Sequence, residues 1–271
     1  MKLLRSTWFR YFVLTISLLL MVRGSYAAQP LTAGEAAALQ TTGEPIVIAM
    51  YQEPESLNPY LSVQTVVNVV ATAVYESLLD IAPDGSFIPV LATEVPSIAN
   101  GGLSEDGLTV TYRLRDGVLW SDGEPFTARD VQFTWEAIMD DSNAVVSRAG
   151  YEDIESIETP DDLTVVITFA RLYAPALTLF EYILPAHGFD GGTAMTGADF
   201  NRAPFGTGPF FVTEWTSGES IVLQANPSYR DPAKVSGLIF RITPSREQSV
   251  LLLQSGEVEV VWDLIEASIP E

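Results

Sequence analysis

The stretch GVLWSDGEPFTARDV, residues 117–131, predicts how a strand connects to a helix in this chain. The preceding LTVTYRLR, residues 108–115, alternates apolar and polar residues as a half-buried strand does. After this strand, the sequences Asp-Gly at 116–117 and Ser-Asp-Gly at 121–123 are turn signals. Thr127, with Asp130 three residues later, predicts a helix N-cap, because a hydroxyl accepts a free backbone N–H and an acid favours the positive helix end. Phe126 and Val131 have the spacing of a hydrophobic staple.

The polar residues of this stretch also allow a catalytic interpretation. Asp116, Asp122 and Glu124 could form a pair of catalytic carboxylates, but they fall in turns and no partner is evident from the sequence. His187 is the only histidine and cysteine is absent, so the sequence supports no Ser–His or Cys–His pair and no zinc cluster. We expect a surface or loop histidine and no catalytic residue.

The N-terminus indicates export. Basic residues precede a short apolar run at 11–22, and Ser-Tyr-Ala-Ala follows. This pattern predicts a Sec signal peptide over residues 1–27, then a flexible leader over 28–44; a permanent membrane anchor is the alternative. Without cysteine, the protein is expected to lack disulfides and a lipid-modified cysteine. We therefore expect a periplasmic or extracytoplasmic protein that is not a lipoprotein.

The charge balance restricts the partners. The formal net charge is -21, and such a chain repels nucleic-acid phosphates and anionic lipid. We expect no nucleic-acid partner. The acidity is explained by solubility, and the alternative is a preference for cationic solutes.

Further patterns predict an α/β protein with two structural regions. Segments in which apolar and polar residues alternate, or in which apolar residues are continuous, predict strands. Polar residues that recur every four positions predict a helix over 66–79. A second helix is predicted to begin after the cap residue Ser245 and to end at Gly256. The segment 237–264 thus reads as a β-α-β unit with parallel strands and a right-handed crossover. The GTGPF segment, 206–210, lacks the lysine of a phosphate-binding loop and is expected to be a turn. The predicted strands are 46–50, 108–115, 163–169, 220–226, 237–242 and 257–264.

The segment YRLRDGVLWSDGEPFTARDVQFTW resembles the signature of the extracytoplasmic solute-binding proteins of peptide/nickel ABC transporters. Similar segments follow the order of that family from about residue 45 to 265: EPESLNPYLS, VYESLLDIAPDGSFIPVLATEV, FGTGPFFVTEW, NPSYR and LLLQSGEVEVVWDL. The resemblance implies a periplasmic-binding-protein fold of class II-like type, with a parallel-rich mixed sheet in a first lobe. That lobe would comprise 45–76 and 185–271, interrupted by an inserted α+β domain over 77–184. Family members are about twice as long, so we expect an N-terminal part without the second lobe.

Two segments are candidates for solute binding. Ligands collect at the carboxyl ends of parallel strands, and Trp262 and Asp263 lie at the carboxyl end of the last predicted strand, where its segment 257–262 ends. Trp262 could equally be a core residue. The resemblance implies that the loop after SLNPY also lines the cleft. The backbone groups at Val63, Gln64 and Thr65, together with the Gln64 side chain, could then extend hydrogen bonds to a peptide as a strand does.

The predicted function is the solute-binding component of an ABC importer. It would deliver oligopeptides or dipeptides to membrane permease subunits by hinge closure of two lobes, as a monomer without cofactor or metal and not as an enzyme. A sensor that presents solute to a chemoreceptor, and a secreted hydrolase, are the alternatives. With one lobe alone, we expect Trp262 to face solvent and peptide binding to be weak.

Overall fold

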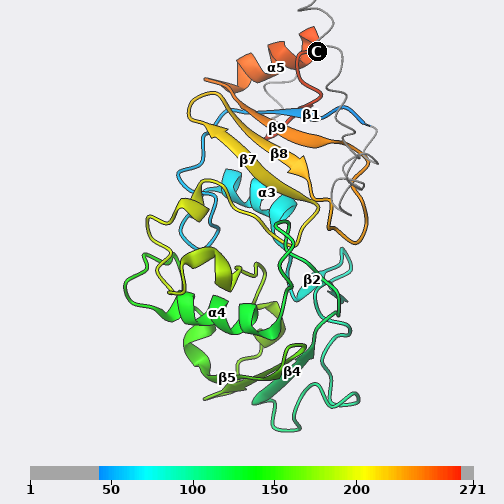
Figure 1. Ribbon diagram of the computed structural model, residues 1–271, viewed down its shortest axis with the longest axis vertical. Coiled ribbons are helices and arrows are strands. Elements are labelled where there is room, and N and C mark those ends of the chain that lie inside the picture. The colour runs from blue at the N-terminus through cyan, green and yellow to red at the C-terminus, as the bar shows by residue number, and fades with distance from the viewer. Residues whose placement is uncertain (1–42, 264–271) are drawn as a thin grey trace, which may run out of the picture. The chain divides into compact units, whose positions relative to one another are not determined.

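The computed structural model describes residues 43–263, and a five-stranded mixed sheet forms one part of them (Figure 1). The strand order is β10-β1-β9-β8-β7. Strand β1 is parallel to both β9 and β10, whereas β7, β8 and β9 are joined antiparallel. The α/β class and the parallel unit are thereby confirmed. The strands are β1 (Ile46–Met50), β7 (Phe210–Thr216), β8 (Ser220–Ala225), β9 (Gly237–Ile242) and β10 (Val260–Val261).

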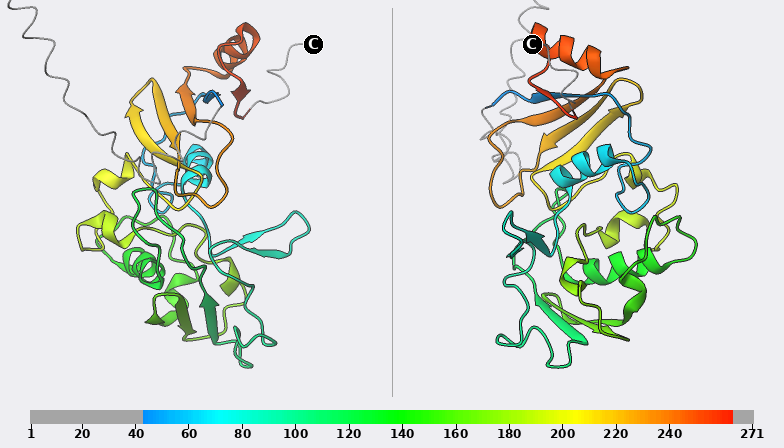
Figure 2. Two further views of the ribbon diagram at one scale, coloured as in Figure 1. Left: turned by 45° about the vertical axis from the view of Figure 1, so that its right-hand side comes forward. Right: turned by 180° about the vertical axis from the view of Figure 1, so that it is seen from behind.

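Helices cover both faces of this sheet. Neighbouring residues of β1 divide between two apolar clusters, because side chains of a strand alternate between faces. Met50 belongs to the main core with Val70 of α3, and Ala49 packs with Leu252 of α5. Figures 1 and 2 show these two helices on opposite sides of the strands. The helices are α3 (Thr65–Val74) and α5 (Arg246–Ser255), the latter capped by Ser245 and ended by Gly256 as predicted.

A three-stranded antiparallel sheet, in the order β4-β6-β5, forms the second part. Helix α4 packs against β5 and β6, and a separate hairpin consists of β2 and β3 (Figure 2). The alternating burial of β6 agrees with its alternating sequence. The remaining elements are β2 (Leu79–Ile81), β3 (Phe87–Pro89), β4 (Thr109–Arg113), α4 (Ala128–Met139), η1 (Tyr151–Asp153), β5 (Ile154–Asp161), β6 (Thr164–Phe169), η2 (Ala176–Thr178), η3 (Ala186–Phe189) and η4 (Asp199–Asn201).

Residues 117–131, called the joint below, form the predicted turns and helix start. The carboxylate of Asp130 accepts the Thr127 N–H at 2.9 Å, the Ala186 N–H at 2.9 Å and the Trp120 indole N–H at 3.4 Å. Burial raises the pKa of the Asp130 carboxyl above its ordinary value, although the hydrogen bonds from Ala186 and Thr127 partly oppose this. The predicted cap at Thr127 is confirmed, and Asp130 connects the joint to the start of η3.

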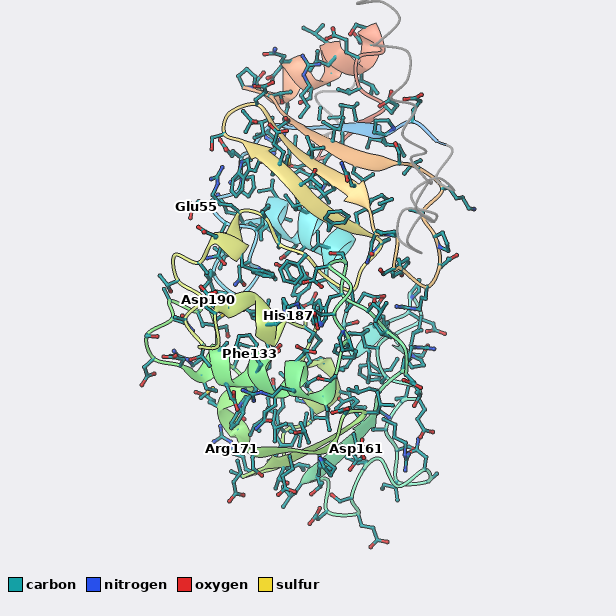
Figure 3. All side chains as sticks on the ribbon, viewed as in Figure 1. Glu55, Phe133, Asp161, Arg171, His187 and Asp190 are labelled. Carbon is teal, nitrogen blue, oxygen red and sulfur yellow. The ribbon has the colours of Figure 1, made fainter. Side chains whose placement is uncertain are left out.

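One expectation about the joint, that its acidic residues have no positioned partner, is wrong for Asp122. Asp122 does have a partner, because its Oδ2 lies 2.8 Å from Nε2 of His187. That histidine lies in η3 next to α4 (Figure 3). Its ring also meets the ring of Trp120 edge-on. The two partners are 65 residues apart, so sequence spacing gave no signal for the pair. Glu124 does behave as a turn residue, since its N–H donates to Asp122 Oδ1 at 3.2 Å.

Helix α3 is shorter than predicted, ending at Val74 instead of residue 79. The Val74 carbonyl accepts the N–H of Gly208 at 2.9 Å, so another segment packs where the helix would continue. A Cβ at Gly208 would lie 2.6 Å from that carbonyl oxygen, which explains the glycine. The GTGPF segment is therefore a close-packing turn that enters β7, as expected.

The last predicted strand is also shorter and less buried than expected. β10 contains only Val260–Val261 and lies at the edge of its sheet, with Val260 43% exposed. Glu259 contacts Val47 through both its backbone N–H, at 3.0 Å, and its carboxylate, at 2.7 Å. Residue 264 lies outside the described residues.

Other predictions are not reached by the described residues. The signal peptide, 1–27, lies outside them, as does the leader except for its last two residues. None of the described helices is long and apolar enough to cross a membrane. The boundaries between the first lobe and the inserted domain, at 76/77 and 184/185, stay a prediction. Near both boundaries the two chain segments are joined, because the Leu78 N–H donates to the Phe180 carbonyl and the Ile183 N–H donates to the Glu76 carbonyl.

Candidate functional site

The carboxyl ends of the parallel strands bring several polar side chains together. Tyr51 follows β1, Arg246 opens the helix after β9, and Trp262 and Asp263 follow β10. We call these four residues the strand edge. In an open α/β sheet this is where ligands bind, so the predicted pair lies in the expected position.

Arg246 organises the strand edge. Its Nη2 lies 2.6 Å from Asp263 Oδ2, its Nε donates to the Asp263 carbonyl at 3.2 Å, and its Cζ lies 3.9 Å from the centre of the Tyr51 ring. The hydrogen bond from Arg246 lowers the pKa of the Asp263 carboxyl and raises that of the guanidinium. Asp263 has a positive φ of 62°, which is uncommon for a residue with a side chain. A solute amine would therefore compete with Arg246 for this carboxylate.

Sequence reasoning missed Arg246 and Tyr51. The two residues are far apart in the sequence, and they come together only because β1 pairs with β9 in the sheet. The available signal was the position of Arg246 directly after the Ser245 cap, at the carboxyl end of a predicted parallel strand.

Trp262 has features both of a core residue and of a solute-contacting residue, the two interpretations that the sequence allows. Its side chain is partly buried and packs against the main core, and its backbone N–H donates to the Ala49 carbonyl at 3.0 Å. The expectation that it faces solvent is therefore only partly met, and a partly exposed indole remains available for contact.

Residues 62–65, called the Val63 loop, lead into α3. Gln64 is the N-cap residue, and its Oε1 accepts the N–H of Glu55 at 2.8 Å. The amide oxygen of Gln64 is thus used within the protein. Val63 is 83% exposed, and within residues 43–263 no hydrogen bond to its backbone is present. Thr65, also exposed, is the first residue of the helix.

The structure does not join the two predicted groups directly. In the described part of the chain, no hydrogen bond or salt bridge links the Val63 loop to Trp262 or Asp263. Between β1 and that loop, Glu53 accepts the Trp215 indole N–H at 2.9 Å and the Gly218 N–H at 3.0 Å. Glu53 therefore fixes the segment after β1 against the hairpin of β7 and β8. Glu55, whose N–H donates to Gln64, lies on the same connection (Figure 3).

The described residues contain no group of three or more His, Cys, Asp or Glu side chains placed to hold a metal ion. The strand edge and the Val63 loop offer hydrogen-bond donors, acceptors and two aromatic rings, those of Tyr51 and Trp262. Such groups can hold a polar solute by hydrogen bonds and packing.

The mixed sheet with helices on both faces, and polar groups at the carboxyl ends of its parallel strands, is the architecture of the periplasmic-binding-protein type. Residues 86–271 match the model of the bacterial extracellular solute-binding proteins, family 5 Middle. The chain belongs to this family. The family is one of binding proteins, which confirms the prediction of a binding protein rather than an enzyme.

Individual relatives agree. Protein XP55 of Streptomyces lividans is 32% identical over 253 residues, covering 89% of this chain and 45% of its own. The structure of NikZ from Campylobacter jejuni in complex with Ni(L-His) has a TM-score of 0.70 at 30% identity, covering 79% of this chain and 42% of that one. The oligopeptide-binding protein AppA from Bacillus subtilis, in complex with a nonapeptide, has a TM-score of 0.72 at 25% identity, covering 80% and 43%. The chain thus spans less than half the length of these relatives.

Proposed function

We propose that this chain forms one face of the solute cleft of an extracytoplasmic binding protein for an ABC importer. The solute is an oligopeptide or dipeptide, delivered to membrane permease subunits after two lobes close around it. The protein acts as a monomer after export. Family membership and the oligopeptide-binding relative AppA support this proposal.

One observation carries the peptide assignment. The Val63 backbone is exposed and has no hydrogen-bond partner among the described residues, next to a Gln64 side chain fixed by Glu55. Extended peptides bind to such free backbone groups in strand fashion, and main-chain hydrogen bonds supply affinity independently of peptide sequence. Trp262 and Asp263 would then contact the solute side chains or its terminal amine.

The test compares two variants at one position. Val63→Pro removes the backbone N–H, whereas Val63→Ala keeps it and removes only apolar side-chain atoms. We expect trialanine, added at millimolar concentration, to shift the NMR signals of the Val63 loop in the unaltered chain and in Val63→Ala. The same shifts should be lost or reduced about tenfold in Val63→Pro.

Thermal melting of both variants shows whether the loop change affects folding. Equal peptide response in the two variants would remove backbone pairing from the proposal. A response to a nickel–histidine complex but not to trialanine would replace the peptide by the ligand type seen in NikZ.

A further inference from the structure

A separate cavity of about 710 Å³ lies beside the C-terminal end of α3. Its walls come from the β2 strand, the segment 177–182 and the turn at 229–230, and it contains no residue of the strand edge or the Val63 loop. Small-molecule sites typically have volumes of roughly 300–1,000 Å³. The cavity is thus large enough for a small organic molecule.

An ion pair forms one wall. Glu76, 8% exposed, accepts from Arg230 Nη2 at 2.5 Å and Nη1 at 2.8 Å, and from the Tyr229 hydroxyl at 3.3 Å. The hydrogen bond to Glu76 raises the pKa of the Arg230 guanidinium. Arg230 is the only cation that lines this cavity in the described structure, and Glu76 neutralises it.

Two further carboxylates line the cavity without a cation. Asp80 and Glu181 are exposed, and within residues 43–263 neither forms a salt bridge. The lining therefore has a net negative charge. Burial first, and then the neighbouring Glu181, raises the pKa of Tyr182; burial and Glu76 do the same for Tyr229.

The rest of the lining is aromatic and apolar. Tyr75 and Tyr182 lie edge to face with ring centres 6.0 Å apart, and Tyr229 lines the cavity near the ion pair. Ile81, which is 54% exposed, and Leu177 also line the cavity. Tyrosine rings attract cations through their faces, and apolar walls bind hydrocarbon.

We propose that this cavity binds an organic cation, namely a protonated primary amine with an aromatic or alkyl body. The ammonium group would lie between Asp80 and Glu181, and the body would pack against the tyrosine and aliphatic side chains. Arg230 is already neutralised by Glu76, so the charges of Asp80 and Glu181 remain and disfavour an anion in this cavity. The strong acidity of the whole chain adds to the local concentration of cations. This site is independent of the proposed transport function.

The experiment uses three probes of similar size on the full chain. Phenethylamine should bind in calorimetry, whereas 2-phenylethanol and 3-phenylpropanoate should bind at least about tenfold more weakly, because both lack the positive charge. The amine affinity should fall as salt increases. In NMR, the amine should shift the signals of Tyr182 and Tyr229 and leave Trp262 unchanged.

Charge-neutral variants locate the ammonium. Asp80→Asn and Glu181→Gln should each weaken phenethylamine binding several-fold, and the double variant more, with unchanged melting temperatures. Glu105→Gln is the matched control, because this exposed carboxylate lies outside the cavity and its loss removes the same charge. The proposal is overturned if the alcohol binds as well as the amine, if the double variant matches the control, if no probe binds saturably, or if the shifts occur at Trp262 instead.

Discussion

At the joint, Asp130 is 4% exposed, and its carboxylate accepts three hydrogen bonds, two from within the joint and one from Ala186. At the strand edge, the Asp263 side chain is 36% exposed and contacts one cation, Arg246. The two regions contain the same kind of group, yet the first is fully used within the protein and the second is partly open. A polar segment whose side chains all have hydrogen-bond partners within the protein therefore stabilises the fold and is not by itself a sign of a binding site.

The Val63 loop extends this comparison to the backbone. The joint has internal partners for backbone groups, such as Trp120 N–H to the Glu124 carbonyl at 2.8 Å. The Val63 backbone has none among the described residues. Function is therefore expected where polar groups remain accessible, and stability where they are internally satisfied.

The largest expected effect is at the joint. Asp130→Ala leaves the N–H groups of Thr127 and Ala186 and the Trp120 indole without their acceptor. We expect the free energy of unfolding to fall by about 3 kcal/mol, because each unsatisfied buried donor costs roughly 1–3 kcal/mol. Urea unfolding followed by tryptophan fluorescence measures this loss.

Asp130→Asn is the matched control, since it keeps one acceptor oxygen and removes the charge. The pKa of Asp130 is raised in the folded state, so its ionisation costs stability. That cost is absent below the unfolded pKa near 3.8 and appears as pH rises through the raised folded pKa. The pH dependence should therefore differ between the natural chain and Asp130→Asn; identical profiles would show that burial does not disfavour the charge.

The joint was largely predictable because its signals are local. Turn residues, a cap and a staple occur within fifteen consecutive positions, and the strands 46–50 and 237–242 have the bounds that their patterns predict. Helix α3 was predicted too long because the residue that ends it, Gly208, is distant in sequence. The Asp122–His187 and Arg246–Asp263 pairs were missed for the same reason.

An intermediate to small effect is expected at the exposed side of the joint. Asp122 and His187 form a pair whose side chains are 38% and 35% exposed. Exposed polar pairs of this kind contribute roughly 0–1 kcal/mol, so Asp122→Asn should lower the free energy of unfolding by about 0.5 kcal/mol. Urea unfolding of Asp122→Asn, His187→Gln and the double variant gives the coupling between them. A loss as large as that of Asp130→Ala would contradict the distinction between buried and exposed groups within the joint.

The smallest effect is expected at the strand edge, where Arg246→Gln removes the partner of Asp263. Arg246 lowers the pKa of Asp263 below its ordinary value, so the pair stabilises the fold above pH 3.8, and this contribution is lost as pH falls through the lowered pKa. In Arg246→Gln the Asp263 pKa should rise towards 3.8, which carboxyl NMR titration measures, while the melting temperature at neutral pH changes little. An unchanged pKa would mean that Arg246 does not hold this carboxylate in solution. The Asp263 carboxylate would then already be available to a solute amine without displacing a guanidinium.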